Sequence, residues 1–429
     1  MAAAQVSQAP MLQPKPSAPV LPQSAPLSPE QIAIIKATAP VLKEHGVTIT
    51  TLFYKNMIDA NPELRNIFSS SSQANGRQPR ALAQSVLAYA TYIDDLPKLQ
   101  HAVERIAQKH VSLTIQPAQY DIVGKYLMEA IGIVLGDAAT PAIVDAWTNA
   151  YNILASVFIG REAELYRAHE NWTGFRKFKI LRKEREADRI TSFYLTPKVG
   201  QPLPKFLPGQ YISVQVFVPE LGHLQSRQYS LSEAPEKEGA YYRISVKREH
   251  DDAVDVDGLI SNMLHDKFNV GDEVELTHPQ GEFLIDPADP TKEGVPAVFI
   301  SAGVGATPLL SMLDSLTQSS ISVRRPVSWL HTSRSKESLP FSEAVQRIQE
   351  RNKDQVSTHV FLREDRDARF DLLNLEHDKD LFTHNNKTEY FICGPESFML
   401  EVRQTLQGLG VARERIFLEL FQTGDVIDD

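Results

Sequence analysis

One histidine lies where the sequence places it inside the protein rather than on its surface. The apolar residues Leu99, Val103 and Ile106 are spaced by four and three, which is the pattern of one face of an amphipathic helix. His110 comes four residues after Ile106 and lies on that same face. The spacing therefore predicts an inward-pointing imidazole. Such an imidazole is either a hydrogen-bonded core residue or a metal ligand, and both interpretations stay open on the histidine alone.

A carboxylate and a phenol continue two other inward faces. An apolar stripe runs from Val144 to Phe158 at spacings of three and four, and Glu162 is the next residue in that series. Another helical stripe begins with Tyr120. Burying an ionised carboxylate costs several kcal/mol unless it finds a partner, and an imidazole N–H is a natural one. Glu162 either finds such a partner or turns to solvent at the end of its helix.

An arginine and a tyrosine two residues apart lie in the strand-like run RQYS. Alternation places Arg227 and Tyr229 on the same side of a strand. There the guanidinium can pair with a pyrophosphate oxygen, and the phenol can lie along a flat ring. A Gly-x-x-Ser sequence at 258–261 follows and opens a predicted helix, whose first N–H groups can hold phosphate. The alternative is an ordinary core strand.

A second phosphate-binding pattern lies near the end of the chain. The run AVFISA predicts a buried strand, and a Gly-Val-Gly turn at 303–305 joins it to a helix entered through Thr307. Such a turn lets the backbone approach a pyrophosphate, whose charge the helix N-terminus favours. Another predicted strand ends at Cys393. We interpret Cys393 as a lining residue rather than a nucleophile, because no histidine is placed to activate it.

Three kinds of elements must position these residues. Residues 28–168 have helical periodicity throughout, with Ser28 as the predicted cap of the first helix. From Trp172 the pattern changes to short alternating strands, which predicts a closed antiparallel β-barrel over 172–288. Strands alternate with helices over 289–429. The predicted fold class is therefore multidomain, with an all-α domain, an antiparallel barrel and a doubly wound, parallel α/β domain.

Composition limits the classes of function. The 429 residues exceed what one hydrophobic core supports, and 42% hydrophobic with 23% charged residues is typical of soluble globular domains. A net charge of −10 argues against general binding of nucleic acid. No apolar run is long enough to span a membrane. The lone cysteine excludes internal disulfide bonds and fits a reducing compartment.

The first 27 residues are predicted to form a disordered tail. Residues 1–27 are rich in Pro, Ala, Ser and Gln, and Lys15 is their one charged residue. The scattered prolines oppose the amphipathic helix of a mitochondrial presequence. The cytoplasm is therefore the expected compartment, with the mitochondrion as the alternative.

The first domain resembles a globin of the single-domain bacterial and flavohemoglobin type. The segments that carry this resemblance are LFYKNM at 52–57, NPELRNIF at 61–68, NGRQPRAL at 75–82, AQKH at 107–110 and REAE at 161–164. The resemblance implies that His110 is the proximal ligand of haem iron, with Tyr120 and Glu162 as its partners. It also implies a distal side lined by Tyr54, Gln78 and Leu82, whose phenol and amide can donate hydrogen bonds to an oxygen-bound ligand. A solvated position at a helix start is the alternative for Gln78.

The rest of the chain resembles the ferredoxin reductase family. RxYS at 227–230, GQY at 209–211 and the later Gly-x-x-Ser carry the resemblance, which implies an FAD site and a nicotinamide site. The residues implied for FAD are Tyr211, Arg227, Gln228, Tyr229, Ser230, Lys247, Gly258, Leu259, Ile260 and Ser261. Those implied for NAD(P)H are Gly303, Val304, Gly305, Ala306, Thr307, Pro308, Cys393, Gly394 and Pro395. The terminal aromatic Phe421 is expected to cover the flavin ring until nicotinamide displaces it.

Three features of the reductase part depart from the family pattern or leave a choice open. An acidic run, HDDAVDVD at 250–257, is longer than expected and predicts a solvated loop. After Phe421 the chain has Gln-Thr-Gly at 422–424, where the family usually has Gly-Pro. Arg334 and Lys336 follow the second strand of the last domain and either meet the 2′-phosphate of NADP or are surface charges. The coenzyme preference therefore stays open.

Taken in order, the three domains resemble a flavohemoglobin. The resemblance implies a monomeric nitric oxide dioxygenase with haem b and FAD: NAD(P)H reduces FAD, FAD reduces the haem iron, and dioxygen bound there oxidises nitric oxide to nitrate. Neither nucleic acid nor a membrane is an expected partner. Two alternatives stay open. One is a haem and flavin reductase that acts on alkyl hydroperoxides or quinones, and the other is an oxygen-binding globin that serves as a sensor or store.

Overall fold

The computed structural model describes six stretches of the chain. They are residues 26–169, 171–199, 203–251, 256–318, 320–365 and 370–421. Most of the predicted tail, residues 1–25, lies outside the described residues. So do 252–255 of the acidic run and 422–429 after Phe421.

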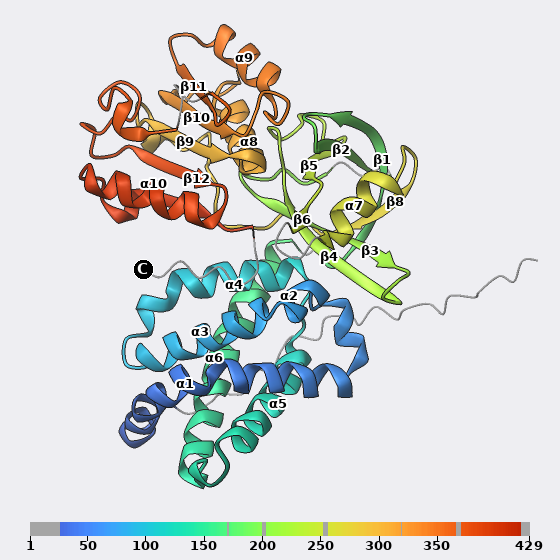
Figure 1. Ribbon diagram of the computed structural model, residues 1–429, viewed down its shortest axis with the longest axis vertical. Helices are drawn as coiled ribbons and strands as arrows, with labels where there is room; N and C mark the ends of the chain where they lie inside the picture. Colours follow the sequence, from blue (N-terminus) through green and yellow to red (C-terminus); the bar gives the residue numbers. More distant parts are fainter. Residues whose placement is uncertain are drawn as a thin grey trace, which may run out of the picture.

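The first module is all-α, as predicted, and we call it the helical domain (Figure 1). Its helices are α1 (Pro29–Ala60), α2 (Ser70–Ala74), α3 (Arg77–Thr91), α4 (Gln100–Ser112), α5 (Pro117–Leu135) and α6 (Pro141–Ala168). The predicted cap is present: the Ser28 hydroxyl accepts from the Gln31 N–H, and the Gln31 side chain accepts from the Ser28 N–H. Helices α1, α5 and α6 begin with proline. Proline suits this position because a backbone N–H at the first helical residue has no partner within the helix, and proline has no N–H.

Helix α4 carries His110 and lies on the side of the helical domain that faces the other two modules (Figure 1). It contains Val103, Ile106 and His110 of the predicted face, and Leu99 directly precedes it. A single 3-10 turn at Leu96–Leu99 precedes it, and Thr114 takes a left-handed conformation with φ of 61°. Thr114 lies where the chain passes from α4 into α5. Helix α4 packs against α6. These contacts bring the helix faces of His110, Tyr120 and Glu162 together.

The second module is an antiparallel sheet that curves into a barrel, and we call it the barrel domain. Its strands are β1 (Arg176–Arg185), β2 (Ile190–Pro197), β3 (Tyr211–Val218), β4 (His223–Ser230), β5 (Tyr242–Lys247) and β8 (Glu273–Leu276), with a small ribbon of β6 (His250–Asp251) and β7 (Val256–Asp257) and one helix, α7 (Leu259–Asp266). The order is β4-β3-β8-β1-β2-β5. A single bridge between Leu231 and Ile244 joins the two edges, so the predicted barrel closes at one point.

The third module is a parallel sheet with helices packed on it, and we call it the parallel-sheet domain. Its elements are β9 (Ala297–Ala302), α8 (Ala306–Leu316), β10 (Val327–Ser333), α9 (Ser342–Arg351), β11 (Val356–Leu362), β12 (Glu389–Cys393), α10 (Glu396–Gly408) and β13 (Ile416–Glu419). The strand order is β11-β10-β9-β12-β13. The order reverses between β9 and β12, which makes a switch point at the carboxyl ends of these strands, where such sheets bind ligands.

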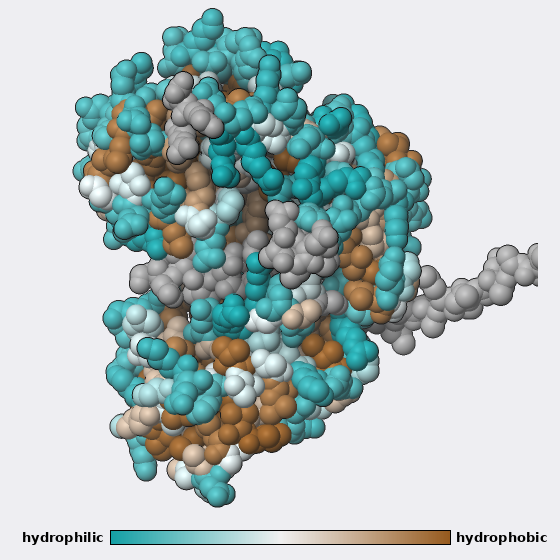
Figure 2. Space-filling view, in the orientation of Figure 1, coloured by the Kyte–Doolittle hydropathy of each residue, from teal (hydrophilic) through white to brown (hydrophobic). Residues whose placement is uncertain are grey.

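The surface differs between the two halves of the molecule. On the side that Figure 2 shows, apolar residues gather on the helical domain, whereas hydrophilic residues dominate the other two modules. Within the described ranges, no helix is both long and apolar enough to cross a membrane.

Candidate active site

Three side chains from three helices meet at His110. Its Nδ1 atom lies 2.8 Å from Oε1 of Glu162 on α6 and 2.9 Å from the hydroxyl of Tyr120 on α5. The Tyr120 hydroxyl also donates to Glu162. The Glu162 side chain is 3% exposed, so the alternative of a solvated carboxylate at the end of its helix is wrong. The sequence prediction that these residues face one another holds in the structure.

The geometry around Glu162 assigns the tautomer of His110. A carboxylate can only accept, so the proton of the neutral imidazole lies on Nδ1 and the lone pair on Nε2. Burial, together with the Glu162 charge, raises the pKa of Tyr120, so its hydroxyl stays protonated and donates. The Tyr151 hydroxyl donates to the Tyr120 carbonyl oxygen at 2.5 Å and holds α5 against α6.

The His110 side chain fits a metal ligand better than a core residue. It is 31% exposed, although it lies on the inward face of α4. In the part of the chain that the structure describes, no hydrogen bond satisfies its Nε2 atom. Phe158 packs against the ring, with centroids 5.6 Å apart. An imidazole fixed through Nδ1 with a free Nε2 would be able to hold haem iron through Nε2.

Two predicted distal residues also meet. Tyr54 on α1 is buried, with its ring 5.4 Å from that of Phe68, and the Gln78 side chain hydrogen-bonds to its hydroxyl. Burial raises the pKa of Tyr54, so the phenol stays protonated and able to donate. Gln78 is half-buried and also accepts from Gln73 at 3.0 Å, and Leu82 is half-buried one turn later on α3. Gln78 therefore does not take the fully solvated position of the alternative interpretation.

The predicted flavin residues lie on two neighbouring strands of the barrel. Tyr211 on β3 pairs with Ser230 on β4, and Tyr229 packs on the barrel core. The Arg227 guanidinium donates to the Ser226 carbonyl oxygen at 2.7 Å, and burial lowers its pKa. Among the described residues no carboxylate pairs with it. A half-buried arginine that has no carboxylate partner fits a phosphate group.

The Gly-x-x-Ser sequence begins α7, as predicted. Gly258 caps the helix, and the Ser261 hydroxyl accepts from the Glu249 N–H at 3.1 Å. Ile260 is buried in the barrel core, whereas Leu259 is exposed. Lys247 binds the Glu249 carboxylate, with 3.0 Å to each oxygen. The roles of these residues toward FAD stay predictions, and Lys247 already has a partner within the protein.

Two loops approach each other at the switch point of the parallel sheet. Gly303, Val304 and Gly305 follow β9, and Gly394 and Pro395 follow β12. A Cβ atom at Gly305 would lie 2.2 Å from the carbonyl oxygen of Cys393, so no side chain fits there. The backbone N–H groups at the start of α8 suit a pyrophosphate.

Several predicted nicotinamide residues serve the packing of these loops. Ala306, Thr307 and Pro308 are buried in the first turn of α8, and the Thr307 hydroxyl donates to the Val304 carbonyl oxygen at 2.9 Å. Cys393 is fully buried, which raises the pKa of its thiol well above the ordinary value. It is therefore not a reactive thiolate. Phe421 follows β13 and is 45% exposed, and its role over the flavin ring stays a prediction.

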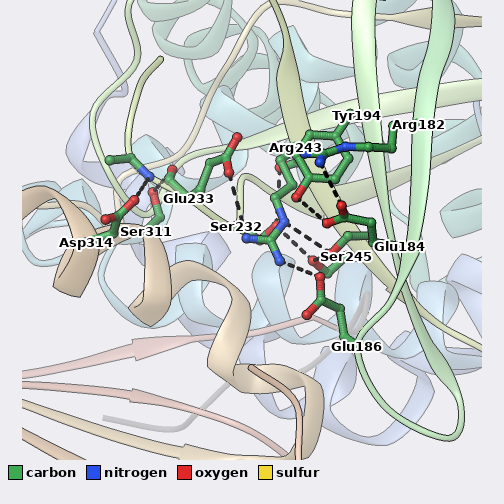
Figure 3. A network of polar contacts seen from close by, with 12 residues as sticks. Arg182, Glu184, Glu186, Tyr194, Ser232, Glu233, Arg243, Ser245, Ser311 and Asp314 are labelled. Atoms are coloured by element: carbon green, nitrogen blue, oxygen red, sulfur yellow. Dashed lines mark hydrogen bonds and ion pairs between the residues drawn. The ribbon is translucent and has the colours of Figure 1, made fainter. Parts of the chain in front are cut away.

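Polar contacts join the parallel-sheet domain to the segment that follows β4 (Figure 3). The Ser311 hydroxyl on α8 donates to the Glu233 carbonyl oxygen at 2.7 Å, and Asp314 accepts from the Ala234 N–H at 3.0 Å. Arg243 lies buried beside this contact and binds Glu186 at 2.5 Å. These contacts hold the segment after Ser230 against α8. They thereby fix the position of the loop before α8 relative to the RQYS run.

The sequence prediction missed the residues where α4 meets the other modules. The Gln108 side chain accepts from the Gly281 N–H at 3.1 Å, and Ser112 accepts from Gln228 at 3.4 Å. Burial, together with the charge of Glu282, raises the pKa of Glu419 at the end of β13, and the charge of Lys109 on α4 opposes this rise. One feature of the sequence could have indicated these interface residues: polar residues surround His110 on an otherwise amphipathic helix.

Three family models match this chain. They are described as globin, over residues 51–158, oxidoreductase FAD-binding domain, over 177–285, and oxidoreductase NAD-binding domain, over 299–404. Their order agrees with the helical, barrel and parallel-sheet domains.

The chain is similar to whole proteins as well. It is 45% identical to the flavohemoprotein of Bordetella pertussis, over 93% of this chain and all of that one, and 42% identical to that of Oceanobacillus iheyensis, over 90% and 95%. A crystal structure of flavohemoglobin from Malassezia yamatoensis with bound FAD and heme matches 92% of this chain and all of that one, with a TM-score of 0.80 and 31% identity. The FAD/NAD-binding domain of a nitric oxide dioxygenase from Vibrio cholerae matches 57% of this chain and 98% of that one, with a TM-score of 0.50 and 33% identity.

Proposed function

This chain belongs to the flavohemoprotein family, and from that premise we propose that it is a nitric oxide dioxygenase, which converts nitric oxide and dioxygen into nitrate with electrons from NAD(P)H. The general activity follows from the family and its modules: the protein is an NAD(P)H-dependent oxidoreductase that uses haem and FAD. Nitric oxide as the substrate is supported by the similarity to the reductase part of the Vibrio cholerae nitric oxide dioxygenase.

The observation that carries the proposal is the contact between His110 and the buried Glu162. When bound, haem supplies the iron at which dioxygen is activated. Glu162 accepts the Nδ1 proton of His110 in a hydrogen bond and increases the electron donation of Nε2. Simple carriage of oxygen does not need a carboxylate there, and burying one is costly. The pair therefore favours an activating role over an oxygen store.

On the distal side, Tyr54 is the proposed proton-bearing partner of the substrate. Its hydroxyl keeps its proton because burial raises its pKa, and Gln78 orients it through a hydrogen bond. A fixed donor stabilises partial negative charge on an oxygen-bound ligand better than water, because it does not have to reorient. Gln78 holds this donor in place.

The reductase modules complete the proposed cycle within one chain. Arg227 and Tyr229 are the proposed contacts of FAD, and the loops at Gly305 and Gly394 are the proposed nicotinamide cradle. The barrel domain contacts both other modules through hydrogen bonds, such as those of the Gly281 and Ala234 N–H groups. We therefore propose that the monomer is the functional unit, and sedimentation of the active holoprotein at the mass of one chain tests this.

The test of the proposed function is consumption of nitric oxide by the purified holoprotein in the presence of NADH and oxygen. We expect consumption far faster than in free solution, with nitrate as the product. Tyr54→Phe should lower this rate about tenfold, while haem content and FAD reduction by NADH stay unchanged. The matched control is Tyr92→Phe, at the exposed end of α3. Consumption at the rate of free solution would exclude the dioxygenase.

The same assay separates the alternatives. A reductase for alkyl hydroperoxides or quinones would turn over faster with those acceptors than with nitric oxide. A sensor or oxygen store would show altered oxygen release in Tyr54→Phe and would form no nitrate even as the wild type.

A further inference from the structure

A chain of hydrogen bonds connects the barrel domain to the helix that carries His110. The first bond runs from the Gly281 N–H to Oε1 of Gln108, over 3.1 Å. Gln108 lies on α4 two residues before His110, and its side chain is buried. The backbone of Gly281 is fixed on the barrel side, because Gln280 and Tyr211 exchange both of their backbone hydrogen bonds.

The backbone at position 281 suits glycine only. Its φ is +124°, a conformation that favours glycine. A Cβ atom there would lie 3.0 Å from the Tyr211 ring. The N–H group that donates to α4 therefore lies next to Gln280, whose backbone pairs with that of Tyr211, a predicted flavin residue.

The second and third bonds continue from Gln108 into the helical domain. Its Nε2 donates to Oε1 of Glu104, one turn earlier on α4, over 2.8 Å. Glu104 in turn accepts from Nε and Nη2 of Arg161 on α6, at 2.6 and 2.9 Å. This two-point pairing with the guanidinium lowers the pKa of Glu104, so the carboxylate stays charged.

Arg161 directly precedes Glu162 on α6. Helices α4 and α6 are therefore joined at two neighbouring points, through Glu104 with Arg161 and through His110 with Glu162. The barrel domain attaches to α4 between these two joints, at Gln108. A shift of the barrel against α4 must move Gln108, and it thereby changes how His110 meets Glu162.

We propose that Gln108 is a positioning residue that couples the seating of the barrel domain on α4 to the orientation of the proximal histidine, with Glu104 and Arg161 as the fixed points on the other side. Its amide suits this place because it accepts with one atom and donates with the other, so both the backbone N–H and the carboxylate are satisfied. The inference goes beyond the proposed function and does not depend on nitric oxide, because it concerns the haem ligand and the internal electron path.

The test compares Gln108→Leu with Gln100→Leu, a matched change at the exposed start of the same helix. In the holoprotein, Gln108→Leu should slow electron transfer from reduced FAD to haem about tenfold and shift the iron–histidine stretching frequency in resonance Raman spectra. FAD reduction by NADH should stay unchanged. In the haem-free chain, the Gly281 amide should exchange its hydrogen faster in Gln108→Leu than in the wild type.

A second variant separates coupling from a general loss of packing. In the double variant with Glu162→Gln, the frequency shifts of the two changes should not add, because both act on the same His110 hydrogen bond. Two results would overturn the proposal. One is a Gln108→Leu protein whose electron transfer and stretching frequency equal those of Gln100→Leu. The other is a loss of haem uptake and of FAD reduction together, which indicates general unfolding.

Discussion

At the scale of single residues, the position of Glu162 decides what His110 can do. The carboxylate is buried near the end of a 28-residue helix and meets an imidazole from another helix at 2.8 Å. Helical periodicity predicted that both side chains point inward, since it depends only on local spacing. It could not predict Gln108 as a contact of Gly281, because the two lie 173 positions apart and neither lies in an informative pattern.

Removing the charge of Glu162 tests its electronic role. Glu162→Gln keeps an acceptor near Nδ1 but removes the negative charge, so haem should still bind while turnover with nitric oxide falls about tenfold. Haem content by absorption and the steady-state rate measure the two effects. A rate equal to that of the wild type would mean that the carboxylate serves packing only.

Removing the imidazole tests the ligand itself. His110→Ala should abolish haem binding, because Nε2 is the proposed iron ligand, while NADH still reduces FAD in the barrel domain. The absorption spectrum should lose its Soret band and retain the flavin bands. Retention of haem with an unchanged spectrum would contradict the assignment, and loss of both cofactors would indicate that the chain had not folded.

At the scale of elements, loops and strand ends decide where cofactors fit. Alternating and helical patterns predicted the strands and helices of both reductase modules, and the Gly-x-Gly turn predicted the loop after β9. The sequence could not show that this loop packs against the one after β12. That closeness arises from the parallel pairing of β9 with β12, two strands that lie far apart along the chain.

A methyl group at Gly305 tests the cradle. Gly305→Ala would place a Cβ atom 2.2 Å from the Cys393 carbonyl oxygen and push the two loops apart. FAD reduction by NADH should slow about a hundredfold, since misplacing reacting groups by about an ångström has an effect of that order. Haem and FAD content should not change. Gly408→Ala, in α10 of the same domain with open space around it, is the control and should react at the wild-type rate.

The buried network between the barrel and parallel-sheet domains should depend on pH. Burial raises the pKa of Glu233 from the ordinary value of 4.5 to about 7, which Arg243 opposes and Asp314 reinforces. The folded protein therefore keeps a proton on Glu233 that the unfolded chain releases, so stability falls as the pH rises through this window. Between about pH 5 and pH 8 the wild type should lose about 1 to 3 kcal/mol more free energy of unfolding than Glu233→Gln.

The control for this pH effect is Glu238→Gln, an exposed carboxylate in the same loop. Its unfolding should follow the wild-type pH dependence. If Glu233→Gln follows the wild type as well, Glu233 does not hold the proton in the folded protein.

At the scale of the whole molecule, the order of the three modules along the chain matches their contacts. The barrel domain contacts both other modules, since its Gly281 N–H donates to Gln108 on α4 and its Glu233 carbonyl oxygen accepts from Ser311 on α8. In Figure 1 it lies beside the parallel-sheet domain and above the helical domain. The change of periodicity at Trp172 predicted a new module, but module contacts depend on side chains such as Gln108 and Ser311 that carry no pattern in the sequence. All the proposed steps of electron transfer from NAD(P)H thus take place within one polypeptide chain.

The yield of nitrate for each NADH consumed tests the central claim most directly. One electron with one nitric oxide and one dioxygen makes one nitrate, so the two electrons of NADH should produce two nitrate ions. We expect this ratio in the holoprotein under limiting NADH with excess oxygen and nitric oxide. Consumption of NADH without nitrate, or with a ratio far below two, would contradict a nitric oxide dioxygenase.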